Sequence, residues 1–198
     1  MPAAERAEVM HRVGAEMESR RAELLEVAAS ETGKTLDQGD PEISEAIDFA
    51  HYYAFQSQEL EKVDGARFVP SKLTVVAPPW NFPLAIPAGG VLAALASGSP
   101  VILKPATPAR RCGAILAQIM WDAGVPRDVL QLVNTADRAA GRRLISHPAV
   151  ERVILTGSYE TAKLFRSWRP ELPLLAETSG KNAIIVTPSS DPDLAVKD

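Results

Sequence analysis

Cysteine and histidine are scarce in this chain of 198 residues, which contains one cysteine, Cys112, and three histidines, His11, His51 and His147. A single cysteine excludes an internal disulfide bond and a cysteine metal cluster. The three histidines are scattered along the sequence and do not form a spacing that zinc ligands use. We therefore predict no bound metal.

Basic charge is not in excess either, because 21 Lys and Arg residues stand against 25 Asp and Glu residues, for a formal net charge of −4. This balance gives no electrostatic basis for binding nucleic acid or an anionic membrane surface. No basic segment followed by an apolar core comes after Met1. We therefore predict no secretory signal and a cytoplasmic location.

The most informative stretch is an uncharged run of 31 residues, Leu73–Leu103, which ends at Lys104. Five prolines and three glycines interrupt it, so it cannot form the continuous helix of a membrane span. We predict a buried strand at Thr74–Ala77, a proline-rich loop, a helix at Ala88–Ala96 and a second buried strand at Pro100–Leu103. Uninterrupted apolar strands are typical of a parallel sheet that helices cover on both faces.

The rest of the chain predicts helices and strands in alternation, which is typical of an α/β fold. An amphipathic helix or helix pair is expected at 3–30, and Pro41 with Glu42 and Glu45 is expected to open a second long helix. In that helix, His51, Tyr52 and Tyr53 could suggest a cofactor site, but they are expected to be core residues. After a polar connector at 60–72, the later helices are expected at Pro108–Ala123, Asp137–Ser146, Tyr159–Trp168 and from Asp191, and the later strands at Val129–Val133, Val153–Ser158, Leu172–Ala176 and Asn182–Val186.

Two polar side chains stand at the carboxyl ends of the central strands. Asn81 lies in the loop Pro79–Pro83 after the first strand, and Lys104 follows the second. Open α/β sheets bind ligands at this edge. An Asn amide can donate a hydrogen bond to an oxyanion, and a Lys can bind phosphate or ribose hydroxyls. For either residue alone, a turn or a solvated side chain is the better explanation, but the pair in one unit favours a site.

A third signal is Thr156-Gly157-Ser158, where a strand runs into a helix. Ser158 is well placed as the N-cap of that helix, and the free amides of a helix N-terminus can bind phosphate. The chain lacks a complete G-x-G-x-x-G motif, so an ordinary capped helix remains the alternative reading.

Glu177 follows an apolar strand and is the candidate general base. We expect burial at the strand end to desolvate its carboxyl group and raise its pKa, as general-base work near neutral pH requires. A capping acid or an ion-pair partner is the alternative. Cys112 lies within a predicted helix with no His or Asp in a telling position, so we interpret it as a packed thiol and not as a nucleophile.

Four stretches together resemble the aldehyde dehydrogenase superfamily: P-W-N-F-P, K-P-A, L-T-G-S and A-E-T-S-G-K-N, in that order. The resemblance runs from about Ala4 to Asp198. It implies a doubly wound, Rossmann-like parallel sheet with flanking helices, which is the cofactor-binding domain of that family. Residues 1–60 would be N-terminal helices packed on this domain, and 61–198 the NAD(P)-binding α/β domain, cut before the catalytic domain.

The resemblance also implies roles for particular residues. Asn81 would hold the oxyanion formed from an aldehyde substrate, and Glu177 would be the general base. The matching nucleophilic cysteine would come after Asp198, so the chain alone is expected to be inactive, and the intact enzyme is expected to be a homo-oligomer. The cofactor, NAD with NADP as the alternative, would contact Pro79, Trp80, Lys104, Ala106, Thr107, Thr156, Gly157, Ser158, Thr178 and Gly180.

Two positions depart from the family pattern. Thr107 stands where the family commonly has an acidic residue for the adenosine ribose, and this leaves the choice between NAD and NADP open. Ser179 replaces one glycine of the family's E-x-G-G motif, which here reads Glu177-Thr178-Ser179-Gly180.

Within the superfamily, three segments are most similar to the 1-pyrroline-5-carboxylate (glutamate semialdehyde) dehydrogenases, some of which are fused to proline dehydrogenase. These are S-E-T-G-K-T at Ser30–Thr35, the H-Y-Y-A helix and A-E-T-S-G-K-N. The product would be glutamate. Two alternatives stay open: an acylating or phosphorylating semialdehyde dehydrogenase on the same scaffold, and a nucleotide-binding module without catalysis.

Overall fold

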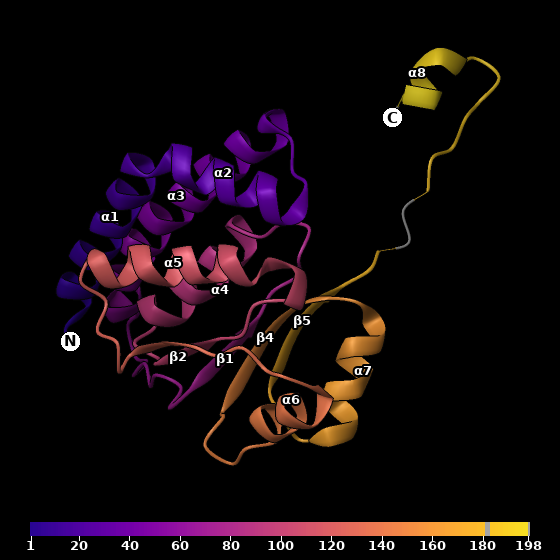
Figure 1. Ribbon diagram of the computed structural model, residues 1–198. Coiled ribbons are helices and arrows are strands. Elements are labelled where there is room, and N and C mark those ends of the chain that lie inside the picture. Colours follow the sequence, from indigo (N-terminus) through magenta and orange to yellow (C-terminus); the bar gives the residue numbers. More distant parts are fainter. Residues whose placement is uncertain (181–182, 198) are drawn as a thin grey trace.

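A five-stranded parallel sheet forms the centre of the molecule (Figure 1). The computed structural model describes residues 1–180 and 183–197. Every strand pair in this sheet is parallel, as the apolar runs of the sequence predict. The strands are β1 (Thr74–Ala77), β2 (Val101–Leu103), β3 (Leu130–Leu132), β4 (Arg152–Gly157) and β5 (Leu174–Thr178).

The strand order is β3-β2-β1-β4-β5, which confirms the doubly wound prediction. The chain moves outward from β1 to β3, returns to the other side of β1 as β4, and moves outward again to β5. The direction of winding therefore reverses between β1 and β4, which pair in register from Thr74 opposite Arg152 to Ala77 opposite Leu155. Such a reversal leaves a crevice at the carboxyl ends of the two strands.

Helices cover both faces of the sheet (Figure 1). One face is covered by α4 (Ala85–Ala96) and α5 (Arg110–Asp122), and the other by α6 (Arg138–Ile145) and α7 (Tyr159–Trp168). The central strand β1 serves both cores, because Val76 packs into the core beneath α4 and α5 whereas Val75 and Ala77 pack into the core beneath α6 and α7. The alternation of side chains along a strand produces this division.

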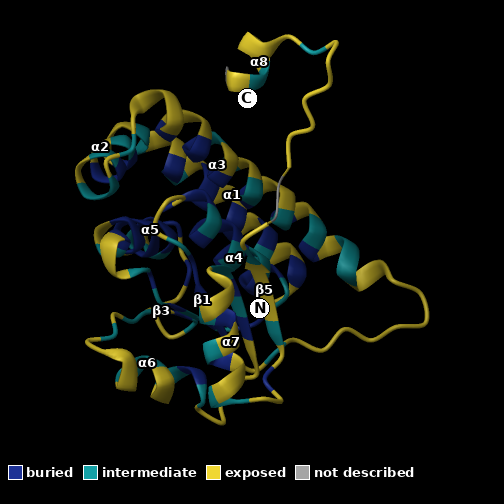
Figure 2. Cartoon of the chain, turned by 90° about the vertical axis from the view of Figure 1, so that its right-hand side faces the viewer, coloured by how far each residue is buried: buried dark blue, intermediate teal, exposed yellow. Residues whose placement is uncertain are grey.

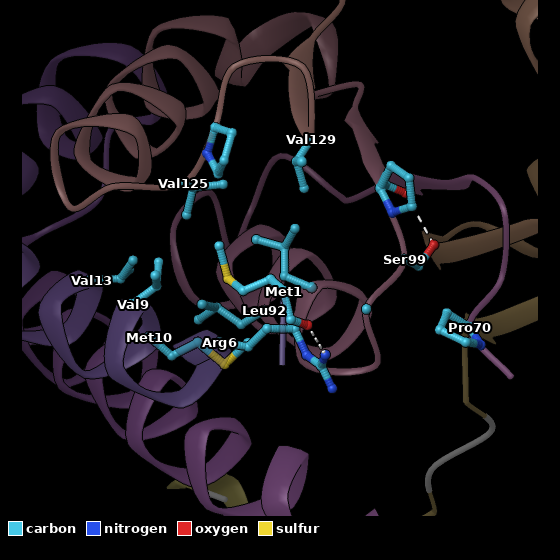
Figure 3. Close-up of a pocket in the computed structure, with 14 residues that line it drawn as sticks. Met1, Arg6, Val9, Met10, Val13, Pro70, Leu92, Ser99, Val125 and Val129 are labelled. Carbon is cyan, nitrogen blue, oxygen red and sulfur yellow. Dashed lines mark hydrogen bonds between the residues drawn. The ribbon is translucent and has the colours of Figure 1, made fainter. Parts of the chain in front are cut away.

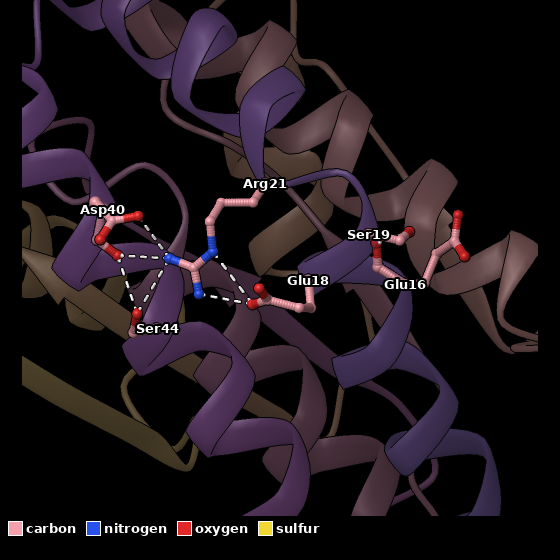
Figure 4. A network of polar contacts seen from close by, with 6 residues as sticks. All are labelled: Glu16, Glu18, Ser19, Arg21, Asp40 and Ser44. Atoms are coloured by element: carbon pink, nitrogen blue, oxygen red, sulfur yellow. Dashed lines mark hydrogen bonds and ion pairs between the residues drawn. The ribbon is translucent and has the colours of Figure 1, made fainter.

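A second layer of helices lies over α4 and α5. It consists of α1 (Ala3–Ser19), α2 (Arg21–Thr32) and α3 (Leu36–Glu59), which share a continuous core with the helices beneath them. Figure 2 shows the buried residues concentrated in α4 and on the sides of α1 and α3 that face it. At the rim of this layer, Arg21 donates to Glu18, Asp40 and Ser44, and so joins the ends of α1, α2 and α3 (Figure 4). Exposed ion pairs of this kind add little stability, so burial holds the layer together.

The outer layer also caps the inner helices with two carboxylates. Glu42 of α3 is buried, and its Oε1 accepts hydrogen bonds from the amides of Leu84 (2.7 Å) and Ala85 (3.0 Å) at the start of α4. Glu31 of α2 accepts from the amides of Arg111 (2.8 Å) and Cys112 (2.7 Å) in the first turn of α5. A carboxylate there satisfies unpaired amides and complements the positive end of the helix dipole.

Lys34 neutralises one of these caps. Its ammonium group forms an ion pair with Oε2 of Glu42, and the two side chains are only 8% and 1% exposed. The same ammonium donates to the backbone carbonyl of Asn81 at 3.0 Å and lies 4.0 Å from the ring centroid of Phe82. The turn between α2 and α3 is thereby tied to the loop that follows β1.

Several boundaries differ from the sequence prediction. The helix expected to begin at Pro41 begins at Leu36, after Thr35 in the N-cap position, and Pro41 is accommodated inside it. The helix expected from Ala88 begins at Ala85, because Pro87 falls at its third position, where no intrahelical partner is needed for a backbone amide.

Two other predictions were wrong: that His51 and Tyr52 are core residues, and that a strand follows β5. His51 and Tyr52 are exposed, and only Tyr53 packs against the core, because the buried face of α3 runs through Ile43, Ala46, Ala50 and Ala54. Of the strand expected at Asn182–Val186, Asn182 lies outside the described residues and 183–186 form no strand. These residues are exposed as the chain leaves the sheet towards α8 (Pro192–Lys197), where a helix was expected (Figures 1 and 2).

Within the part of the chain that the structure describes, no helix combines the length and hydropathy that crossing a bilayer demands.

Replacing Glu42 tests the importance of its cap. We expect Glu42→Ala to lower the free energy of unfolding by about 3–5 kcal/mol, because it leaves Lys34 buried without its partner and two amides unpaired. Urea unfolding followed by circular dichroism measures the change. Glu45→Ala, at an exposed position one turn further along α3, is the matched control and should cost less than about 0.5 kcal/mol.

A double variant separates the two contributions. Glu42→Gln combined with Lys34→Met keeps a hydrogen-bond acceptor for α4 and removes the buried charge, so it should be more stable than Glu42→Ala alone. Equal stabilities of Glu42→Ala and Glu45→Ala would contradict the role assigned to this cap.

Candidate functional site

A cleft of about 880 Å³ lies at the carboxyl ends of the strands, where the winding of the sheet reverses. Loops after β1, β2 and β4 form its walls, together with the end of β5. Ten of the twelve site residues predicted from the sequence line it: Pro79, Trp80, Asn81, Lys104, Ala106, Thr156, Gly157, Ser158, Glu177 and Thr178. The topology of the sheet therefore brings together residues that lie up to about a hundred positions apart.

Asn81 lies on a loop that is held at both ends. Pro78 and Pro83 flank this loop and are buried, whereas Trp80, Asn81 and Phe82 between them are exposed. Lys34 binds the backbone carbonyl of Asn81, so the backbone is fixed at the residue whose side chain lies on the cleft wall. A fixed backbone and an exposed amide suit a donor that must be positioned before a ligand arrives.

Lys104 is half-buried beside this loop. Its amide donates to the carbonyl of Val76 at 2.9 Å and extends the pairing of β1 with β2, and its ammonium donates to the carbonyl of Pro105 at 3.3 Å. Burial, and secondarily the charge of Arg110, lowers the pKa of Lys104. A partly desolvated cation gains more from an anionic ligand than a fully hydrated one does.

The turn between β4 and α7 presents a helix N-terminus to the cleft. As predicted, Ser158 is the N-cap, and its Oγ accepts from the amide of Thr161 at 3.1 Å. Gly157 lies in open space, because a Cβ atom built there would meet only Cδ1 of Leu155, at an ordinary contact distance of 3.8 Å. Packing within the protein therefore does not require glycine at this position, which leaves room for a ligand to approach the backbone.

The helices that follow β1 and β2, α4 and α5, do not offer a free N-terminus to a ligand. The N-terminus of α4 already holds the carboxylate of Glu42, and that of α5 holds Glu31. The cap of α7 is the neutral hydroxyl of Ser158. Of these three helices, α7 is the one whose N-terminus is suited to a phosphate group.

Glu177 was expected to be buried at the end of a strand, and this prediction was wrong. It lies within β5, opposite Thr156 of β4, and its side chain is exposed, so the predicted desolvation is absent. The reason is the position of β5 at the edge of the sheet, where most of its residues are exposed. The sequence showed an apolar strand but not that the strand lies at the edge.

Two predicted residues do not line the cleft. Thr107 is exposed and begins a short 3-10 helix (Thr107–Ala109). Gly180 is also exposed, and the neighbouring Ser179 lines the cleft instead. Sequence reasoning missed other lining residues, including Glu45 of α3, Phe82, Ile86 of α4, and Thr161 and Phe165 of α7. Phe82 belongs to the same loop as Asn81 and could have been included, whereas Glu45 offered no signal beyond its place on a helix.

A second cavity, of about 310 Å³, lies near the amino ends of β2 and β3, where Pro100 and Val129 line it (Figure 3). It contains none of the predicted site residues. Its lining is largely apolar, with side chains such as Val9, Met10 and Leu92. Arg6 lies at its rim but is engaged with the backbone carbonyls of Met1 and Ala96. The cleft, and not this cavity, is therefore the candidate site.

Cys112 lies in α5, outside both cavities, and its side chain is fully buried. Burial, reinforced by the neighbouring carboxylate of Glu31, raises the pKa of its thiol. A buried thiol that resists deprotonation is a poor nucleophile, in agreement with its interpretation as a packing residue.

The reactivity of Cys112 can be measured directly, because it is the only cysteine. We expect a thiol reagent such as 5,5′-dithiobis(2-nitrobenzoate) to leave the native chain unmodified at pH 7.5 and to modify one thiol per chain in urea. Ser167→Cys in a Cys112→Ala background places a thiol on the exposed side of α7 and should react without denaturant. Rapid modification of native Cys112 would show that an accessible thiolate exists.

Comparison with known proteins gives consistent results. The family model described as "Aldehyde dehydrogenase family" matches residues 1–198. The chain is 39% identical over 206 residues to the bifunctional protein PutA of Escherichia coli (strain K12), covering 100% of this chain and 15% of that protein. It is 32% identical over 211 residues to 1-pyrroline-5-carboxylate dehydrogenase 2 of Bacillus subtilis (strain 168), covering 98% of this chain and 41% of that protein.

Solved structures agree with the fold. Proline utilization A (PutA) from Corynebacterium freiburgense superposes with a TM-score of 0.93 at 54% identity, covering 100% of this chain and 21% of that one. An NAD-dependent benzaldehyde dehydrogenase from Corynebacterium glutamicum superposes with a TM-score of 0.82 at 27% identity, covering 90% of this chain and 42% of that one. The chain thus spans between 15% and 42% of the length of these relatives. Because the family model matches it from end to end, the chain belongs to the aldehyde dehydrogenase family.

Proposed function

We propose that this chain is the nucleotide-binding part of an NAD(P)-dependent aldehyde dehydrogenase. The observation that carries the proposal is the cleft at the β1–β4 reversal, where an accessible helix N-terminus, a half-buried lysine and an exposed amide meet. Doubly wound sheets bind dinucleotides at this place. The benzaldehyde dehydrogenase that shares the fold is described as NAD-dependent, which supports the same assignment here.

The residues present fit a dinucleotide. The first-turn amides of α7 and the open space at Gly157 suit a pyrophosphate group, and Lys104 supplies a positive charge for a phosphate or hydrogen bonds for ribose hydroxyls. Thr156 and Thr178 add hydroxyl groups at the ends of β4 and β5, and Pro79, Trp80 and Ala106 complete the wall. The nicotinamide of such a cofactor accepts a hydride. Thr107 lies outside the lining, so NAD and NADP both remain within the proposal.

The catalytic roles fall to two residues of the cleft. The side-chain amide of Asn81 would donate to the oxyanion that forms when a nucleophile adds to the aldehyde. The exposed carboxylate of Glu177 is accessible to water and would take a proton from the water that releases the product acid. The only cysteine of this chain is buried away from the cleft, so the attacking thiolate would come from outside these 198 residues, and the chain alone would not turn over.

The proposed substrate is glutamate semialdehyde, in equilibrium with 1-pyrroline-5-carboxylate, and the product glutamate. Support comes from the relatives, among them the Bacillus subtilis protein described as 1-pyrroline-5-carboxylate dehydrogenase 2 and the two PutA proteins. The division of the chain at residue 60 and a homo-oligomeric parent enzyme stay predictions.

Nucleotide binding can be tested on the chain itself. Trp80 lines the cleft and is 52% exposed, so titration with NAD or NADP should quench its fluorescence. We expect Gly157→Val to weaken binding at least about tenfold, because the new side chain fills the space beside the helix N-terminus. Gly141→Ala on α6, where a Cβ atom meets nothing within 4 Å, is the control and should bind as the wild type does. Equal affinities of the two variants would place the nucleotide elsewhere.

The catalytic roles can be tested in a chimera in which these residues replace the matching segment of the Bacillus subtilis enzyme. With glutamate semialdehyde as substrate, we expect Asn81→Ala to lower kcat by about 10²–10³-fold and Glu177→Gln by about 10²–10⁴-fold. Both changes are at exposed positions, so the variants should fold, and Glu45→Gln in the same cleft serves as the control. NADH formation by the isolated 198-residue chain would contradict the proposal that its nucleophile lies elsewhere.

A further inference from the structure

Two of the three histidines meet on the surface of the outer helical layer, outside the cleft. His11 of α1 and His51 of α3 are separated by 40 residues, yet their Nδ1 atoms lie 2.8 Å apart and share a hydrogen bond. The rings are stacked, with centroids 5.1 Å apart and planes inclined by 30°, and both side chains are exposed. Neither residue lines the cleft or the second cavity, so the proposed function does not explain the pair.

A glycine in α1 makes this contact possible. A Cβ atom at Gly14 would lie 2.9 Å from Nε2 and 3.0 Å from Cε1 of His51, so the imidazole occupies the space that a larger residue would fill. Glycine inside a helix costs about 1 kcal/mol relative to alanine. Gly14 directs the ring of His51 along α1 towards His11, with its Nε2 against the helix and its Nδ1 facing the other imidazole.

The distance between the two nitrogens is close to the spacing of adjacent ligands on a metal ion. Imidazole nitrogens bind zinc and similar ions at about 2.0–2.1 Å. Two of them lie about 3 Å apart at the right angles of an octahedral ion, and about 3.4 Å apart at the tetrahedral angle that zinc prefers. The 2.8 Å between the two nitrogens needs a small adjustment of the side chains to reach the octahedral spacing, and an ion bound there takes the place of the proton that the two nitrogens share. Imidazole is a preferred ligand of the late first-row divalent ions, which bind in the order Ni²⁺ < Cu²⁺ > Zn²⁺.

We propose that His11 and His51 form a surface site for a late first-row divalent transition-metal ion that bridges α1 and α3. Among the residues that the structure describes, no group of three or more His, Cys, Asp and Glu side chains could hold a metal, so water completes the coordination here. The sequence predicted no metal because 40 residues separate the two histidines. The bridge stabilises the helical layer that carries Glu31 and Glu42, and it does not depend on the nucleotide site.

The experiment is a titration of the chain with Ni²⁺ by calorimetry, together with thermal unfolding. We expect one ion per chain and a rise in Tm of about 3–6 °C at a Ni²⁺ concentration about tenfold above Kd. His11→Gln and His51→Gln should each abolish both effects. His147→Gln, at an exposed histidine whose Nδ1 accepts from the amide of Ala149, is the matched control and should keep them.

A further variant tests the geometry without removing a ligand. Gly14→Ala retains both histidines but displaces the ring of His51, so Ni²⁺ affinity should fall while the chain remains folded by circular dichroism. Unchanged Ni²⁺ binding in His11→Gln or in His51→Gln overturns the proposal, as does an equal loss in His147→Gln. Undiminished affinity in Gly14→Ala would overturn the argument from spacing.

Discussion

The fold depends on carboxylates that reach from one layer of helices into the ends of another. Glu42 and Glu31 each accept two backbone hydrogen bonds at the start of an inner helix, and they set α4 and α5 against the helices that carry the two acids. Apolar packing alone is not directional and would tolerate small rotations of one layer over the other. A charged group with two amide partners allows one arrangement, and the ion pair with Lys34 makes the buried charge of Glu42 tolerable.

The same contacts restrict where the proposed nucleotide could bind. Since α4 and α5 have their positive ends occupied, the N-terminus of α7 is left for an external anion, on the opposite face of the sheet. Lys34 links structure and site, because the ammonium that neutralises Glu42 also holds the backbone of Asn81. The outer helical layer thus positions Asn81, whose side-chain amide is proposed to act on the substrate. None of the residues with a proposed catalytic role belongs to that layer.

The central strands, and the meeting of most candidate residues in one cleft, could be predicted from the sequence, because apolar runs bounded by glycine and proline specify buried parallel strands whose ends converge. The N-cap role of Ser158 was also predictable, since it depends on neighbouring residues alone. The partners of Glu42 and the exposure of Glu177 could not be predicted in this way. Both depend on which elements become neighbours, and the same holds for the approach of His11 to His51.

The order of the strands has a consequence for the way the chain acquires its structure. The buried residues of the core under α4 and α5 all lie between Ala7 and Leu130, whereas the opposite core needs residues up to Leu172. During synthesis the first core can close while one edge of the central strand β1 still lacks its partner β4, whose Val153 pairs with Val75. Pairing over such a sequence separation is slow. The late arrival of β4 makes the open edge of β1 the point at which a nascent chain is most exposed to incorrect pairing with another molecule.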